Sequence, residues 1–292
     1  MNKTLVLTDS VACLPASLVQ ELSIQVIPVR LTVEGTVYRD MTQELPDMEV
    51  HRLQEIGGID TTPWSPEHYC EQYLHAAGSS DSLLHVVAFS SFTSTMSLAL
   101  AGAAMARERL PDLHIEVVDS GSTLMAQGFV ALAAARAAAT GSSLEDVVSA
   151  AVGARDVVRM VVSLGSLRYV ARTGRVPRLA SWASTLLNVK PVVGLAQGRE
   201  EPLGLVRSRS QEMATLVKKV SRLVQGSGPV RLAVMDTGRW DDGEELLARL
   251  RGELSFDESF HAPLSPVSEI VSGPGLLGVA FHAEATSMNA EL

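Results

Sequence analysis

The sequence has few of the residues on which several common kinds of site depend. It contains only two cysteines, Cys13 and Cys70, which lie far apart in the chain. Two isolated thiols make neither a disulfide framework nor a CxxC site. The chain has four lysines among 292 residues, and none follows a glycine-rich loop in the Walker A spacing. We therefore expect a protein of the reducing cytoplasm that does not bind ATP through a P-loop.

Runs of positive charge and long apolar runs are also missing. The formal net charge is −9, and no basic stretch interrupts this acidic balance. Nucleic acids and anionic membrane surfaces are therefore poor candidates as partners. The longest tract of small apolar residues, 129–139, is broken by Arg136 and is shorter than the roughly 20 apolar residues of a membrane span. The first ten residues do not have the pattern of a signal peptide. We expect no stable membrane insertion.

The usual catalytic signatures are absent from the sequence. There is no HExxH, GxSxG or SxxK motif. One GxGxxG match, at residues 273–278, contains Pro274 and is followed by no crossover unit, so it does not predict a dinucleotide site. The seven histidines are scattered, and His85 lies in an apolar run typical of a buried strand. These signatures therefore nominate no nucleophile with its base and no cofactor.

Hydroxyl groups are concentrated between a predicted strand and a predicted helix. Residues 83–88 form a short apolar run, and residues 96–106 have the small and apolar side chains of a packed helix. Hydroxyls at a helix start cap the free backbone N–H groups, and the same groups together with the helix dipole attract anions. The cluster is therefore either a capped, solvated loop or a neutral pocket for a carboxylate or phosphate. Its members are Ser90, Ser91, Thr93, Ser94 and Thr95.

The same order of strand, polar loop and helix occurs three times. Residues 5–8 precede Asp9, and residues 115–118 precede Asp119. Strands that alternate with helices indicate a parallel α/β sheet, which binds ligands outside the carboxyl ends of its strands. We expect Asp9, Ser91 and Asp119 to share one edge of that sheet. The two aspartates could fasten loops or caps, or could form an acid/base pair or a metal site.

The length and composition predict two domains. The chain is 46% apolar, which is enough for more than one ordinary core. We place an N-terminal α/β domain with hydroxyl-rich loops at residues 1–156 and a C-terminal mixed α/β domain at residues 157–292. A group of arginines follows the boundary and is interpreted as a solvated or carboxylate-paired surface.

Several segments together resemble the DegV family of bacterial fatty-acid-binding proteins. The resemblance spans nearly the whole chain, and its specificity comes from the order and spacing of motifs that are weak alone. The segments are TDS at 8–10 with LP at 14–15, VIPV at 26–29, TTPWSP at 61–66, SSFTS at 90–94, VDS at 118–120 with QG at 127–128, TGRV at 173–176, LLNVKP at 186–191, VR at 206–207 and GPG at 273–275.

The resemblance implies a protein that buries one long-chain fatty acid between its two domains. It also implies that the protein does no chemistry itself, needs no cofactor or metal, and presents the acid to a separate fatty-acid kinase that makes an acyl phosphate. By the same resemblance, the fatty-acid carboxylate is bound by Thr61 and Ser94, with Ser91, Thr93 and Thr62 nearby; Phe92, Trp64, Val271 and Gly273 neighbour the acyl tunnel or head group; and Arg207, with Arg175, contacts the kinase.

Some positions depart from the family pattern. The family usually has a histidine two residues before its Gly-Pro-Gly, where this chain has Val271, and Phe92 and Trp64 replace smaller or different residues. These aromatics either reshape the tunnel or serve ordinary packing. Two other hypotheses remain. One is an enzyme that acts on a small anionic substrate at the same strand ends with Asp9 or Asp119, and the other is a regulatory protein with a vestigial cavity.

Overall fold

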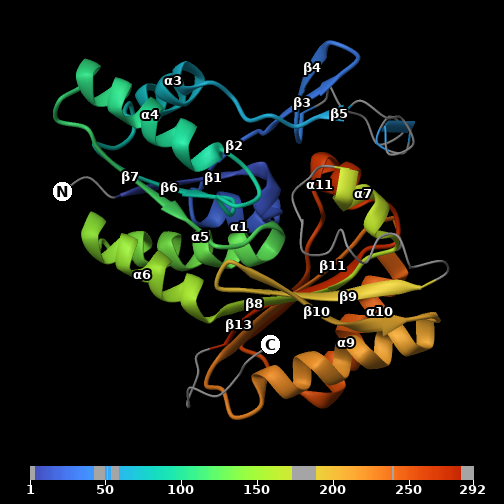
Figure 1. Ribbon diagram of the computed structural model, residues 1–292. Coiled ribbons are helices and arrows are strands. Elements are labelled where there is room, and N and C mark those ends of the chain that lie inside the picture. Colours follow the sequence, from blue (N-terminus) through green and yellow to red (C-terminus); the bar gives the residue numbers. More distant parts are fainter. Residues whose placement is uncertain are drawn as a thin grey trace.

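The structure, a computed structural model, describes residues 4–42, 50, 52–53, 59–172, 189–238 and 240–283. Its N-terminal part is built on a parallel sheet, as the alternation of strands and helices predicts (Figure 1). The strand order is β2 (Gln25–Ile27), β1 (Leu5–Asp9), β6 (Ser82–Val87) and β7 (His114–Asp119), with every neighbouring pair parallel. The helices whose bounds the structure describes in this part are η1 (Ser10–Ala12), α1 (Ala16–Glu21), α3 (Pro66–Ala76), α4 (Thr95–Arg109), α5 (Leu124–Ala139) and α6 (Leu144–Val157).

Alternate side chains of the parallel strands pack against different helices. Leu83 and Val87 of β6 belong to the core shared with α3 and α4. Leu84 and Val86 belong instead to the core that contains α5. Because successive strand residues point to opposite faces, a continuous apolar strand requires cover on both sides. The apolar run recognised in the sequence is therefore a central strand between two layers of helices.

The C-terminal part is a mixed sheet, and this confirms the predicted fold class. Its six strands lie in the order β10 (Arg199–Val206), β9 (Lys190–Ala196), β8 (Val158–Ser163), β13 (Leu277–Ala283), β11 (Val230–Asp236) and β12 (Glu258–His261). Of the strand pairs described in this sheet, only β11–β12 is parallel. Helices α9 (Arg209–Val224) and α10 (Trp240–Glu253) cover one face and form a separate core with it.

Helix α5 lies between the two large sheets. Its side chains share one core with Val6 of β1 and with Met160, Met235 and Ala280 of the mixed sheet. Small residues allow this position, because a helix packed on several sides must let other backbones approach closely. This explains the alanine-rich tract at 129–139, which is apolar around most of its circumference. Among the described residues, no helix is both long enough and apolar enough to cross a membrane.

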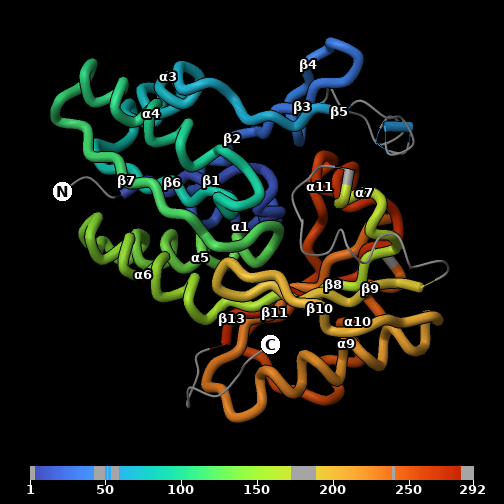
Figure 2. Tube along the Cα trace, viewed as in Figure 1, coloured from blue at the N-terminus to red at the C-terminus, as the bar shows by residue number. Residues whose placement is uncertain are grey.

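A third, small antiparallel sheet stands apart from the parallel sheet, above helix α11 (Figure 2). It consists of β4 (Thr36–Arg39), β3 (Arg30–Val33) and β5 (Ile59–Asp60). Leu31 and Val33 pack with Val267 and Ile270 of α11 (Pro266–Ser272), which belongs to the C-terminal part. A short helix, α7 (Leu167–Arg172), lies beside α11. The small sheet therefore connects the two halves of the chain by apolar contact.

The predicted polar edge is present in the fold. Asp9 is the last residue of β1, Asp119 is the last residue of β7, and Ser91 lies in the loop after β6. Since these strands are parallel neighbours, their polar loops meet at one edge, as expected. The edge faces the second half of the chain rather than open solvent at Asp9, whose side chain is buried.

Candidate ligand pocket

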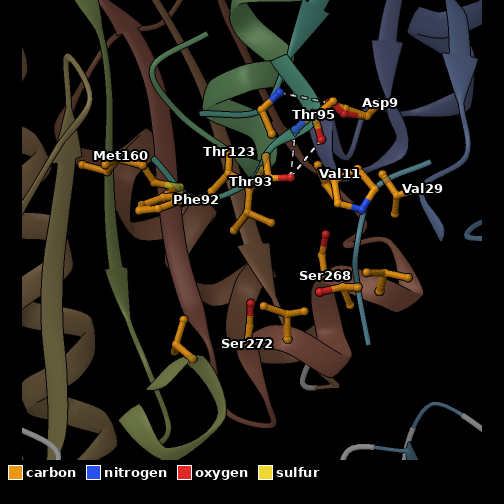
Figure 3. Close-up of a pocket in the computed structure, with 18 of the residues that line it drawn as sticks. Asp9, Val11, Val29, Phe92, Thr93, Thr95, Thr123, Met160, Ser268 and Ser272 are labelled. Atoms are coloured by element: carbon orange, nitrogen blue, oxygen red, sulfur yellow. Dashed lines mark hydrogen bonds between the residues drawn. The ribbon is translucent and has the colours of Figure 1, made fainter. Parts of the chain in front are cut away.

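The polar edge opens onto a pocket between the two halves of the molecule (Figure 3). Its volume is about 170 Å³, room for on the order of ten water-sized groups. Strands β8 and β9 form one wall, the loops after β1, β6 and β7 another, and helix α11 a third. The aliphatic lining includes Val11, Val29, Met160, Val162, Leu164, Val170, Val193, Leu195, Val267, Val271 and Leu276.

Two threonines supply hydroxyl groups to the pocket. Thr93 and Thr95 both line it, and their Oγ1 atoms lie 2.9 Å apart within hydrogen-bond distance. The backbone N–H of Thr95, the first residue of α4, donates to Thr93 Oγ1 at 3.3 Å, although the N-cap residue of this helix is Ser94. The phenol of Tyr69, a residue of α3, is hydrogen-bonded to the Thr95 side chain. The hydroxyl pair is therefore held by a helix start and by a neighbouring helix.

Asp9 has two oxygens in different surroundings. Its Oδ2 accepts hydrogen bonds from the backbone N–H of Ala88 at 3.0 Å and from Gln127 Nε2 at 3.1 Å. Its Oδ1 is buried and has no hydrogen-bond partner among the described residues. Burial raises the pKa of Asp9 to about 6, although both hydrogen bonds act in the opposite direction. Asp9 also lines the pocket, where it lies next to Thr95 (Figure 3).

The second aspartate of the edge has a different role. Asp119 Oδ2 accepts from the backbone N–H of Ser90 at 3.1 Å, and Asp119 Oδ1 accepts from that of Gly121 at 2.8 Å. It is not one of the pocket residues. Its contacts are those of a loop-fastening carboxylate. Among the described residues, no group of three or more His, Cys, Asp or Glu side chains is arranged to hold a metal ion.

Trp64 and Phe92, the two aromatics that depart from the family pattern, both line the pocket. The indole N–H of Trp64 donates to the Pro28 carbonyl at 2.7 Å, and the ring stacks on His68 with 4.2 Å between centroids. Phe92 makes an edge-on contact with Phe89, with 5.0 Å between centroids. Each ring is therefore fixed by packing and also forms part of the pocket wall.

The structure brings together some of the predicted site residues but not all of them. Thr61, Thr93, Phe92, Trp64 and Val271 line the pocket. Arg175 lies outside the described residues. The remaining predicted residues are described away from the pocket lining; they are Ser91, Ser94, Thr62, Gly273 and Arg207.

Local contacts explain several of these positions. Ser94 is exposed and lies between Thr93 and Thr95, which line the pocket. The backbone carbonyl of Ser94 accepts a hydrogen bond from Ser97 Oγ at 2.9 Å, whereas its hydroxyl makes no capping hydrogen bond to α4. Thr62 Oγ1 donates to Asp60 Oδ1 at 2.5 Å on the surface. Gly273 is buried with a φ of 74°, and a Cβ there would collide with the Tyr169 ring, which accounts for glycine.

Sequence reasoning missed the serines of α11. Ser268 and Ser272 line the pocket one helical turn apart. Their spacing of four residues on a short helix is a signal that could have placed them on one face, but nothing in the sequence indicates that this face meets Asp9 and Thr95. Ser268 Oγ also lies 2.9 Å from Ser265 Oγ, so it has a partner within its own helix start.

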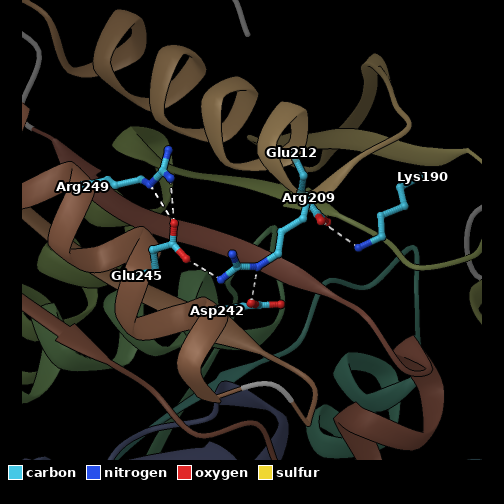
Figure 4. A network of polar contacts seen from close by, with 6 residues as sticks. All are labelled: Lys190, Arg209, Glu212, Asp242, Glu245 and Arg249. Carbon is cyan, nitrogen blue, oxygen red and sulfur yellow. Dashed lines mark hydrogen bonds and ion pairs between the residues drawn. The ribbon is translucent and has the colours of Figure 1, made fainter.

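A network of charged side chains organises the surface near Arg207. Arg209, in the first turn of α9, binds Asp242 of α10 at 2.6 Å and also Glu245 (Figure 4). Glu245 accepts in turn from Arg249 at 2.7 Å, and Lys190 binds Glu212 at 2.7 Å. The backbone N–H of Arg207 donates to Gln211 Oε1 at 2.9 Å. The backbone of Arg207 is thus fixed while its side chain is exposed.

Comparisons with known proteins agree on one family. A family model described as "Uncharacterised protein, DegV family" matches residues 3–284. A DegV domain-containing protein from Mycobacterium tuberculosis is 30% identical over 284 residues, which are 96% of this chain and 98% of that protein. A fatty-acid-binding DegV family protein from Thermus thermophilus is similar in structure with a TM-score of 0.87 at 25% identity, over 96% of this chain and 99% of the other. A stearic-acid-binding protein from Eubacterium ventriosum has the same fold, with a TM-score of 0.86 at 20% identity, over 97% and 99% of the two chains.

Proposed function

Because the chain belongs to the DegV family, we propose that it binds a long-chain fatty acid in the pocket between its two domains. The observation that carries this proposal is a largely aliphatic cavity with hydroxyl groups beside Asp9. Each buried methylene contributes about 0.8 kcal/mol, so an acyl chain supplies most of the affinity. A buried carboxylate needs donors, and Thr93, Thr95 and Thr61 are in the pocket to provide them.

We propose that the bound carboxyl group is then presented to a separate fatty-acid kinase in the cytoplasm, and that this chain is a carrier without catalysis of its own. Two observations support a carrier. Asp119 is engaged with backbone N–H groups and is not among the described residues that line the pocket, and the pocket lining is largely aliphatic. Both described cysteines are free thiols, which fits a reducing compartment.

Thr93→Val is expected to weaken fatty-acid binding about tenfold, because a hydroxyl that binds a carboxylate is replaced by a methyl group of similar size. The measurement is mass spectrometry of the gently purified protein, intact and after organic extraction, together with titration of the lipid-free protein with oleic acid. Ser94→Ala, at the exposed neighbouring position, is the matched control and is expected to change affinity less than threefold, within the range of one weak contact.

The outcomes separate the head-group assignment from the function. If Ser94→Ala loses the lipid while Thr93→Val keeps it, the carboxylate is bound by the residue that the family resemblance favours, and our assignment of Thr93 is wrong. If the wild-type protein carries no lipid and takes up no oleic acid, the proposed function itself is wrong.

Arg207→Ala is expected to slow kinase-dependent acyl-phosphate formation about tenfold, because an exposed arginine on a fixed backbone is a common energetic centre of protein interfaces. The lipid content should not change, since Arg207 does not line the pocket. The assay combines the lipid-loaded protein with a DegV-associated fatty-acid kinase and ATP. Arg199→Ala, which changes an exposed arginine at the opposite end of β10 from Arg207, is the control. Equal rates for wild type and Arg207→Ala would contradict this role.

A further inference from the structure

The unpartnered oxygen of Asp9 suggests how the pocket accepts an acid. We propose that Asp9 holds a proton when the ligand is bound and that its Oδ1 shares this proton with the ligand carboxyl group, so that binding of the fatty-acid anion takes up one proton from solvent. This inference rests on the proposed function. It adds a residue that contacts the ligand and a proton that accompanies it.

The geometry leaves few other ways to satisfy Oδ1. Oδ2 already accepts two hydrogen bonds, from Ala88 N and Gln127 Nε2, whereas Oδ1 is buried without a described partner. An ionised carboxylate is an acceptor only, and so is an ionised ligand head group. Two such groups at one buried site repel each other, and the pair is stabilised when it retains one proton between two oxygens. The proton then makes the missing hydrogen bond of Oδ1.

The position of the hydroxyl pair places the ligand head group at the same end of the pocket. Asp9 and Thr95 lie next to each other, while Met160 lies at the far side of the view (Figure 3). Tyr69 lies near both Asp9 and Thr95, because it is hydrogen-bonded to Thr95 and the charge of Asp9 contributes to raising its pKa. A carboxyl group that binds Thr93 and Thr95 is therefore adjacent to Asp9.

Three buried titratable side chains on the elements around Asp9 stay neutral in the neutral pH range. Burial raises the pKa values of Tyr69 and Tyr73 on α3 well above their usual range, and burial lowers the pKa of His85 on β6 to about 3. All three are therefore neutral between pH 5 and pH 8. On α5 the neighbour is the neutral amide of Gln127. The charged residues that also line the pocket are Arg30 of β3 and Glu200 of β10.

This arrangement predicts a pH dependence of affinity with a defined sign. In the empty protein, burial raises the pKa of Asp9 to about 6, so the proton is present below that pH and absent above it. Above pH 6 the ligand must bring a proton from solvent, and affinity is expected to fall by up to about tenfold for each pH unit. Between pH 6 and pH 8 the expected loss is at least tenfold.

Asp9→Asn is the decisive variant, because asparagine has the shape of a protonated aspartate. Its carbonyl oxygen can accept from Ala88 N and Gln127 Nε2, and its NH₂ group can donate into the pocket at any pH. Lipid-free wild type and variant are titrated with oleic acid from cyclodextrin at pH 5.5, 7 and 8. We expect similar affinities at pH 5.5 and at least tenfold tighter binding by the variant at pH 8. The protonation of free oleic acid affects both titrations equally, so it cancels when the affinities of wild type and variant are compared at the same pH.

A measurement of proton uptake tests the same proposal with the wild-type protein. Binding heats at pH 7 are compared in two buffers that differ in their enthalpy of ionisation, and wild type should take up close to one proton more than Asp9→Asn. Glu200→Gln distinguishes the other carboxylate of the pocket and should retain the wild-type pH dependence.

The failures of the two proposals are distinguishable. Equal pH dependence and equal proton uptake in wild type and Asp9→Asn would overturn the role of Asp9 while leaving fatty-acid binding intact. Loss of the pH dependence in Glu200→Gln but not in Asp9→Asn would assign the proton to Glu200 and would also overturn the role of Asp9. Absence of binding in all variants at every pH would reject the fatty-acid ligand itself.

Discussion

Leu195→Trp is expected to reduce the bound fatty acid at least tenfold while leaving the protein folded. Leu195 is a β9 residue that lines the pocket and lies opposite Met160 of β8 in register. An indole directed into a cavity of about 170 Å³ occupies space that the acyl chain needs. Overpacking of a filled core costs about 1–3 kcal/mol, and an existing cavity lowers that cost. The measurement is lipid content by extraction and mass spectrometry, with thermal unfolding followed in parallel.

Leu205→Trp is the matched control for this substitution. Leu205 lies on the neighbouring strand β10, and 43% of it is exposed, so the new ring extends into solvent. Its lipid content should equal that of wild type. A stoichiometric fatty acid in Leu195→Trp would show that the ligand lies elsewhere and would contradict the pocket assignment.

Asp40→Ala is expected to lower the free energy of unfolding by about 3 kcal/mol or more. Asp40 is fully buried, its Oδ2 accepts from Ser10 Oγ at 2.6 Å, and its Oδ1 accepts from the backbone N–H of Val267 at 3.0 Å. Removal of the carboxylate leaves these donors buried without partners, at about 1–3 kcal/mol each. Because Val267 lies in the first turn of α11, the helix that forms one pocket wall, the variant should also retain less lipid. Urea unfolding of the lipid-free protein measures the first effect.

The control is Asp60→Ala, which removes an exposed carboxylate with two hydrogen bonds to Thr62. Surface substitutions of this kind usually change stability by less than about 1 kcal/mol. Similar losses for the two variants would mean that Asp40 does not join the halves of the molecule as its contacts indicate.

Local patterns were sufficient to predict the parallel sheet and its polar edge. A short apolar run followed by hydroxyl or carboxylate residues and then by a helical pattern is a signal of local sequence, and it occurs at Asp9, Ser91 and Asp119. Parallel strands necessarily bring such loops together, so the edge follows from the pattern. The sequence also predicted a mixed α/β C-terminal domain, without the order or the direction of its strands.

The inward residues of the site could not be predicted to the same accuracy. The direction of side chains in the loop before α4 depends on backbone torsion angles that no periodic pattern specifies. The sequence therefore suggested Ser94 and Thr93 together, and the structure places Thr93 and Thr95 in the pocket with Ser94 exposed. The wall formed by α11 is also beyond local reasoning, because Ser268 and Asp9 line the same pocket although most of the chain separates them in sequence.

The junction between the halves limits how this molecule can move. Helix α6 ends at Val157 and β8 begins at Val158, so no flexible tether separates the two parts. Helix α5 is wedged between both sheets, and Arg136 of α5 binds Glu258 of β12 at 2.6 Å. A hinge motion that separates the two sheets would have to disrupt the apolar core that they share with α5. We therefore expect the two sheets to stay packed together when a ligand enters or leaves the pocket, with only local opening of the structure.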